Sequence, residues 1–204
     1  MAKILMESQE VLKRYNQMIN IRFPAINAFL LAAIFLKIFI KVPFPDLLFF
    51  LISFMSISTI IYDIIFSQIK KPKASQIVNS YFGYLLFDLI ILTIIIYLIG
   101  GITWIGFIFY GLYIYIGFLL FPRHYSIFYI FYCALLYTLL VIFQALRIFP
   151  PQEIFPLEKR IPQNPYFVLS SWLGAVIFLL VLGYFGDTFY KILAEKIEKL
   201  KETK

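Results

Sequence analysis

The sequence predicts an all-α integral membrane protein, a bundle of six transmembrane helices whose last helix continues into a cytoplasmic amphipathic, coiled-coil-like helix. Three observations carry this prediction. Of the 204 residues, 62% are hydrophobic and only 14% are charged, too few for the surface of a soluble domain. Apolar runs of roughly 18 or more residues recur along the chain, and each is long enough to cross a bilayer as a helix. The runs are continuous and do not alternate with polar residues, which excludes the strands of a membrane barrel.

Six apolar segments are expected to be the membrane spans. They cover residues 23–42, 46–68, 77–99, 103–121, 125–148 and 166–187. The chain then divides into a cytoplasmic amphipathic N-terminal segment (1–22), a transmembrane domain (23–187) and the start of a cytoplasmic helix (188–204). No A-x-A-like cleavage site follows the first apolar run, so this run is expected to be retained as a signal anchor.

The loop charges predict the orientation, because cytoplasmic loops carry an excess of Lys and Arg. With the N-terminus inside, thirteen positive residues fall on the inner side and five on the outer side. The inner residues are Lys3, Lys13, Arg14, Arg22, Lys70, Lys71, Lys73, Arg123, Lys191, Lys196, Lys199, Lys201 and Lys204. The outer residues are Lys37, Lys41, Arg147, Lys159 and Arg160. The prediction is a multi-pass inner-membrane protein with both termini in the cytoplasm. Its net charge of +7 then reflects contact with anionic lipid, and no nucleic-acid partner is expected.

The chain changes character after the sixth span. Polar residues appear at Asp187, and apolar residues recur at steps of three, four and three. These apolar residues are Tyr190, Leu193, Ile197 and Leu200. The spacing is that of a heptad seam, through which this helix would form a homodimer. Two heptads are too few to hold a coiled coil by themselves, since about three or four are needed.

Two other features of the later spans favour packing or spacing. Residues 148–166 carry five of the ten prolines, which predicts an extended outer connection, either a stiff spacer or a lid. In the sixth span, small residues are spaced four apart and predict close helix packing. They are Ser170, Ser171, Gly174 and Ala175.

Asp88 is the most unusual residue of the apolar runs, since it lies close to the midplane of the third span. An ionised carboxylate there costs about 2.5–3.5 kcal/mol on insertion scales, so we expect Asp88 to face other helices. Candidate hydrogen-bond donors lie in the fourth and fifth spans: Tyr110, Tyr113, Tyr115, Tyr129, Tyr132, Tyr137 and Gln144. Two interpretations stay open: a sensing or coupling point inside the bundle, or a structural interhelical hydrogen bond worth about 1 kcal/mol.

The remaining polar groups favour structural roles. Asp63 lies near the cytoplasmic end of the second span, within reach of Lys70 or Lys71. His124 is the only histidine and Cys133 the only cysteine, so neither predicts a metal site. The chain contains no G-x-S-x-G, P-loop or paired-carboxylate arrangement. We therefore assign it no catalytic residue, metal or cofactor.

The stretches "LLFDLIILTIIIYLIGG" and "GYFGDTFYKILAEKIEKLKE" resemble the six-helix membrane sensor region of bacterial histidine kinases of the pilus-regulating and redox-responding types. The matching residues are Asp88, Thr93, Tyr97, Gly100 and Gly101. The resemblance implies that Asp88 is a buried polar group of the family type and that the two glycines form a tight outer turn. The candidate sensing and coupling residues are therefore Asp88, Tyr97, Gly100, Gly101 and Asp63.

The chain also departs from these kinases. Redox-responding members carry Asn-Pro-Phe after the turn, in a motif associated with quinone, where this chain has Trp104, Ile105 and Gly106. Quinone sensing is therefore not carried over. The phosphoacceptor histidine and the ATP-binding module lie outside these 204 residues, so a response regulator would be a partner only through that module.

Two functions from different classes stay open at this stage. The first is the signal-input domain of an ATP-dependent protein-histidine kinase, with membrane lipid around it and a small or lipid-like ligand as one candidate stimulus. The second is a small transport subunit, because "FLLAAIFLKIFIKVPFP" and six spans in about 200 residues are similar in outline to the substrate-binding subunits of vitamin importers. A structural or assembly protein is a third alternative.

Overall fold

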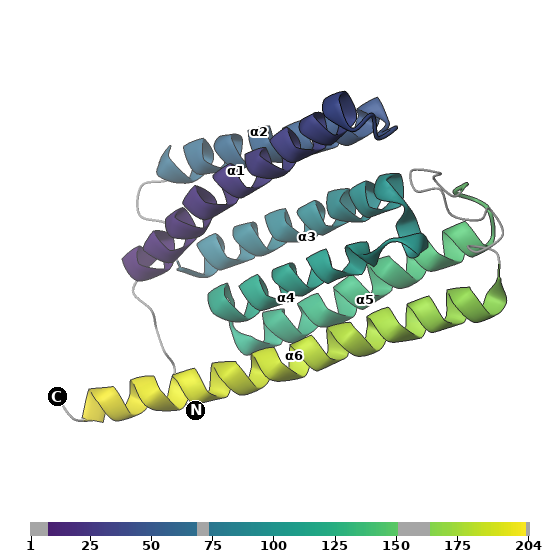
Figure 1. Cartoon of the computed structure of the whole chain (residues 1–204). Helices are drawn as coiled ribbons and strands as arrows, with labels where there is room; N and C mark the ends of the chain where they lie inside the picture. The colour runs from purple at the N-terminus through teal and green to yellow at the C-terminus, as the bar shows by residue number, and fades with distance from the viewer. Residues whose placement is uncertain (1–7, 69–73, 151–163, 203–204) are drawn as a thin grey trace. The chain divides into compact units, whose positions relative to one another are not determined.

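The computed structural model describes residues 8–68, 74–150 and 164–202, and within these ranges all regular structure is helical. The helices are α1 (Ser8–Phe39), α2 (Asp46–Gln68), α3 (Ala74–Ile99), α4 (Ile108–Leu120), α5 (Arg123–Ala145) and α6 (Pro165–Glu202) (Figure 1). Two short 3₁₀ turns, η1 (Gly101–Thr103) and η2 (Ile105–Phe107), precede α4. The predicted all-α class is confirmed. Most of the proline-rich connection, residues 151–163, lies outside the described residues.

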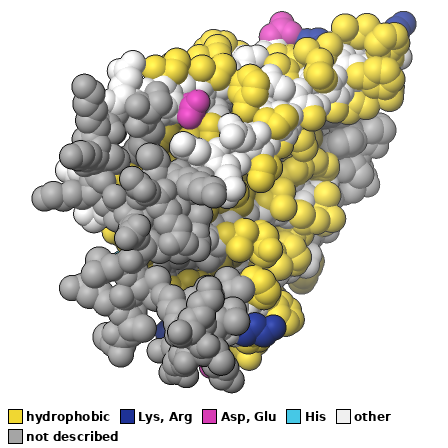
Figure 2. Space-filling model, turned by 90° about the vertical axis from the view of Figure 1, so that its left-hand side faces the viewer, with side chains coloured by type: hydrophobic (Ala, Val, Ile, Leu, Met, Phe, Trp, Pro, Cys, Tyr) yellow, Lys and Arg dark blue, Asp and Glu magenta, His cyan; other side chains and the backbone are white. Residues whose placement is uncertain are grey.

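Five of the described helices are long and apolar enough to cross a membrane. The candidate spans are Tyr15–Phe39, Asp46–Ile65, Ser75–Ile99, Arg123–Ala145 and Pro165–Ile192. Hydrophobic side chains cover much of the face in Figure 2, as expected of a surface in contact with lipid. These helices indicate a multi-pass membrane protein. The fourth expected span, 103–121, is a shorter apolar helix, Ile105–Leu120, because the residues around Gly101 form a turn.

The first helix differs from the expected division of the N-terminus. Its candidate span begins at Tyr15, eight residues before the predicted start at Phe23, and the helix continues through Pro24. The described part of the expected amphipathic segment and the first span form one continuous helix. Tyr15 and Ile19 of this segment are buried. Arg22, expected in a cytoplasmic segment, therefore lies inside the candidate span.

The chain forms two compact units, Met1–Leu98 and Ile99–Lys204. In the first unit α1 packs against α2. The Lys37 ammonium forms an ion pair with Asp46 across the turn between these two helices, and its Nζ lies 4.7 Å from the Phe49 ring centroid. Ring contacts between Tyr62 and Tyr81 join α2 to α3.

In the second unit α6 packs against both α4 and α5. Ser126 at the start of α5 donates a hydrogen bond to the Gly117 carbonyl of α4, at 2.9 Å. A Cβ on Gly183 would overlap Ile130, and a Cβ on Gly186 would overlap Phe118. α6 therefore packs closely against Ile130 and Phe118 near its middle.

The small residues at the start of α6 behave differently from one another. A Cβ on Gly174 would meet no atom within 4 Å, whereas Ala175 is fully buried. Close packing at this end of α6 therefore falls on Ala175 and not on Gly174.

Two helices end on a left-handed residue that is not glycine. Lys41 after α1 has φ 59° and Arg147 after α5 has φ 58°. The Val42 N–H donates to the Leu36 carbonyl at 3.2 Å, across the left-handed Lys41. After α5, the Phe149 N–H donates to the Phe143 carbonyl at 3.1 Å, across the left-handed Arg147.

Candidate functional site

The first unit contains a charge pair inside the membrane-spanning helices. Asp88 is fully buried in the middle of the α3 span, and its Oδ2 forms an ion pair with Arg22 Nη2 of α1. The Arg22 side chain is only 12% exposed. Because each charge neutralises the other, the pair lowers the cost of placing either one in lipid.

Four tyrosines surround this pair, and we call them the tyrosine cluster: Tyr15, Tyr62, Tyr81 and Tyr84. The Arg22 guanidinium carbon lies 4.6 Å from the Tyr84 ring centroid, a cation–π contact. The rings of Tyr62 and Tyr84 stack with centroids 4.2 Å apart, and those of Tyr15 and Tyr81 are 4.5 Å apart. Helices α1, α2 and α3 each contribute at least one ring, so the cluster joins all three helices of the unit.

Hydroxyl and amide groups extend this polar layer. The Tyr84 hydroxyl lies 3.1 Å from Thr59 Oγ1 of α2, and either group can donate the hydrogen bond. Asn27 Nδ2 of α1 donates to Ser56 Oγ of α2 at 2.9 Å. Thr59 and Ser56 are both buried. Interhelical hydrogen bonds of this kind hold helices together where burial from water supplies no driving force.

The arrangement suits electrostatic coupling between α1 and α3. Among the described residues, no group of three or more His, Cys, Asp or Glu side chains could hold a metal ion. Asp88 Oδ1 is buried and has no hydrogen-bond partner in the described part of the chain. The carboxylate is therefore held mainly by one cation, so a change at Arg22 or at the Asp88 proton would alter the contact between α1 and α3.

The partner of Asp88 is not the one that its sequence context suggests. The expected donors lie in α4 and α5, whereas the charged partner comes from α1. Polar residues precede Arg22 in the sequence, so hydropathy places the first span after it. A single arginine at the edge of one apolar run, with a single aspartate inside another, is the signal that could have revealed the pair.

Asp63 and Tyr97 are the other candidate residues of the first unit. Asp63 is exposed on α2, and Lys70 and Lys71, its expected partners, lie outside the described residues. Tyr97 is half-buried on α3, nine residues after Asp88. Neither joins the tyrosine cluster in the contacts described above.

The Gly100-Gly101 turn is a second predicted feature, and it belongs to the second unit. Gly100 has φ 148° and Gly101 has φ 59°, values that favour glycine. The Ile102 N–H donates to Gln144 Oε1 of α5 at 2.9 Å. A Cβ on Gly101 would overlap the Gln144 side-chain amide. Gly101 is therefore required both for the backbone conformation and because a Cβ would not fit beside Gln144. Gln144 is an expected donor to Asp88, and in the structure it accepts the hydrogen bond of this turn.

A third feature lies where α6 changes from apolar to polar sequence. Arg123 at the start of α5 donates to Asp187 from Nε at 2.5 Å and from Nη2 at 3.1 Å, and Lys191 Nζ lies 2.8 Å from Asp187 Oδ2. Nearer the start of α6, Trp172 Nε1 donates to Thr138 Oγ1 of α5 at 2.9 Å. These bonds hold α6 to α5 at two points along the helix.

The predicted signalling seam continues from this point. Tyr190 is half-buried, while the side chains of Leu193, Ile197 and Leu200 lie outside the described residues. The backbone of α6 is helical through all four positions.

No protein-family model, curated protein or solved structure matches this chain. The resemblance to sensor kinases thus rests on the sequence motif around Asp88 and Gly101.

Proposed function

We propose that this chain is the membrane signal-input domain of a two-component histidine kinase, which passes a stimulus through α6 to a cytoplasmic kinase module. The observation that carries this proposal is the continuity of α6. Its 38 residues correspond to a length of about 57 Å at 1.5 Å per residue, against a hydrocarbon core of about 30 Å. A helix that leaves the membrane unbroken can carry a rotation or shift from one side to the other.

The contacts of α6 hold this helix in one defined position against α4 and α5. Its apolar part is bonded to α5 through Trp172, and the point where its sequence becomes polar is held by the Asp187 pair with Arg123. Between these points, Gly183 and Gly186 allow close packing. A tightly packed helix tends to move between discrete positions and not by continuous deformation.

The proposal takes six membrane crossings, with both termini in the cytoplasm. The apolar helix Ile105–Leu120 supplies the fourth crossing, with a length of about 25 Å from three 3₁₀ and thirteen α-helical residues. A helix slightly shorter than the hydrocarbon core is accommodated by local thinning of the bilayer. With Arg22 inside the first span, twelve basic residues then lie on the cytoplasmic side against five on the outer side.

The Arg22–Asp88 pair and the tyrosine cluster are the coupling point in this proposal. A buried ion pair has two distinct states, paired and broken, and these differ by several kcal/mol. A stimulus that acts on the helices of the first unit would change the balance between the two states.

Two experiments test the kinase assignment. The first reads the gene beyond the Lys204 codon: a continuing frame that encodes a phosphoacceptor histidine and an ATP-binding domain is expected, and a stop codon would refute the kinase assignment. The second measures autophosphorylation of the full-length product in nanodiscs with Asp88→Asn. Asp46→Asn is the matched control, because Asp46 takes part in an exposed ion pair. The proposal expects a changed rate for the first variant only.

The homodimer is tested by single-cysteine crosslinking at residues 189–200 in a Cys133→Ser background. Inter-chain crosslinks should peak at Tyr190, Leu193, Ile197 and Leu200. Crosslinking without a period along the helix would remove the dimer from the proposal.

The transport subunit remains the alternative, and no contact described above favours it. The groove described below is lined by apolar groups apart from two hydroxyls, which does not suit a water-soluble vitamin. Tight binding of such a vitamin by the purified protein would favour the transport subunit over the signal-input domain.

A further inference from the structure

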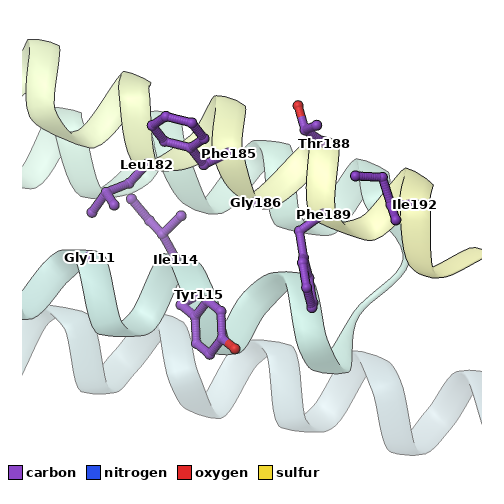
Figure 3. A pocket seen from close by; sticks show the side chains of 9 residues that line it. All are labelled: Gly111, Ile114, Tyr115, Leu182, Phe185, Gly186, Thr188, Phe189 and Ile192. Atoms are coloured by element: carbon purple, nitrogen blue, oxygen red, sulfur yellow. The ribbon is translucent and has the colours of Figure 1, made fainter.

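A groove of about 390 Å³ lies between α4 and α6 within the second unit (Figure 3). Gly111, Ile114 and Tyr115 of α4 form one wall. The other wall comes from α6: Leu182, Phe185, Gly186, Thr188, Phe189 and Ile192. The two glycines bring the walls close together, since a Cβ on Gly111 would overlap Leu182 and one on Gly186 would overlap Phe118. The volume is within the usual range of small-molecule sites.

We propose that this groove binds one acyl chain of an anionic phospholipid, with the lipid headgroup next to Lys196. This goes beyond the signal-input function and does not depend on it. The argument rests on the polarity of the groove, its length along α6, and the charge at its end.

The walls suit hydrocarbon. The rings of Tyr115, Phe185 and Phe189 are each about half exposed, so they offer apolar surface to an occupant. The Thr188 hydroxyl already donates to the Tyr184 carbonyl of its own helix at 2.9 Å. It therefore needs no polar partner from a ligand, and a hydrocarbon chain leaves it satisfied.

The length of the groove matches one leaflet. From Leu182 to Ile192 is ten residues, or about 15 Å along the helix, which is half of the roughly 30 Å hydrocarbon core. The candidate span of α6 ends at Ile192, so the groove runs from about the midplane to the membrane edge. A single acyl chain has this path in a bilayer.

Lys196 lies at the end of the groove. It follows Ile192 by four residues and Phe189 by seven, so all three lie on one face of α6. It is exposed and about 6 Å beyond the membrane edge, at the depth of the phosphate groups. Helical side chains lean toward the N-terminus, which directs the ammonium back toward the groove. From residue 188 onward the chain carries five lysines against three glutamates, a further attraction for an anionic headgroup.

The test uses the full chain in nanodiscs with phosphatidylglycerol or phosphatidylcholine that carries a photoactivatable diazirine in the acyl chain. Adducts mapped by mass spectrometry should concentrate on groove residues. The adduct yield with phosphatidylglycerol should be about fivefold that with phosphatidylcholine, because one lysine near the surface attracts an anionic headgroup by this factor. Lys196→Gln should remove this preference. Lys191→Gln is the matched control, since it removes the same charge on a different face and should keep the preference.

A second variant tests the groove independently of charge. Thr188→Trp should fill the hollow and lower the adducts from both lipids, while Leu180→Trp, on an exposed apolar position outside the groove, should leave them unchanged. Circular dichroism of each variant checks that the helices are retained. Adducts spread evenly over the lipid-facing surface, or equal effects of the two lysine variants, would overturn the proposal. Efficient inter-chain disulfides at Thr188→Cys in Cys133→Ser, with no groove adducts, would show that a second copy occupies the groove instead.

Discussion

Removal of the Arg22–Asp88 pair gives the sharpest test of the first unit. Asp88→Leu leaves the Arg22 charge with 12% exposure in a membrane-spanning helix, and Arg22→Met leaves a fully buried carboxylate. Removing one partner of a buried pair costs about 3–5 kcal/mol. In Asp88→Leu, the cation–π contact with Tyr84 offsets part of this cost. We therefore expect each single variant to lose about 3 kcal/mol of unfolding free energy.

The double variant Arg22→Met/Asp88→Leu should lose only about 1 kcal/mol, because two apolar side chains replace two charges of similar size. The free energy of unfolding would be measured by far-UV circular dichroism in detergent micelles titrated with SDS. A double variant less stable than either single variant would refute the reasoning, since the two residues would then act independently.

The exposed Lys37–Asp46 pair provides the matched control for this cycle. Its side chains are 37% and 97% exposed, so solvent and salt screen this surface pair and its contribution to stability should be small. Lys37→Met and Asp46→Leu should therefore leave the unfolding midpoint nearly unchanged.

Three further changes test other contacts by the same unfolding measurement. Gly101→Ala should cost about 2–4 kcal/mol, from the left-handed backbone and the overlap with Gln144, and a loss below 1 kcal/mol would contradict the described turn. Lys41→Gly should stabilise by about 1 kcal/mol relative to Lys41→Ala, because glycine has no Cβ penalty at φ 59°; equal stabilities would argue against the left-handed end of α1. Asp187→Asn should cost about 1 kcal/mol, and high salt should reduce the wild-type advantage, since Arg123 is half exposed; a salt-independent loss would exclude an electrostatic origin.

Hydropathy predicted the helices well because lipid requires long apolar segments with internally satisfied backbones. The class and the positions of α2, α3, α5 and α6 follow from this requirement alone. It could not predict the extent of α1, since Tyr15 and Ile19 become buried only through contacts with other helices. Nor could it predict the short α4, whose length depends on how many residues the Gly101 turn takes.

The Gly100-Gly101 turn has one property that the sequence predicts and another that depends on helix packing. Two adjacent glycines at the end of an apolar run are sufficient to predict a tight turn, because only glycine adopts such φ values without strain. That Gln144, 42 residues later than Ile102, accepts the hydrogen bond of this turn depends on how α5 packs. No local pattern in the sequence encodes that contact.

The sequence by itself determined that this is an all-helical membrane chain, that Asp88 is out of place in lipid, and that α6 becomes polar after Asp187. These properties follow from composition and periodicity, which act within a single segment. Only the tertiary structure decided that Arg22 neutralises Asp88, that Gly183 and Gly186 make the close contacts of α6, and that α4 and α6 leave a groove. Each of these depends on which residues of different helices face one another, and helix packing sets that through many small contacts that no single segment specifies.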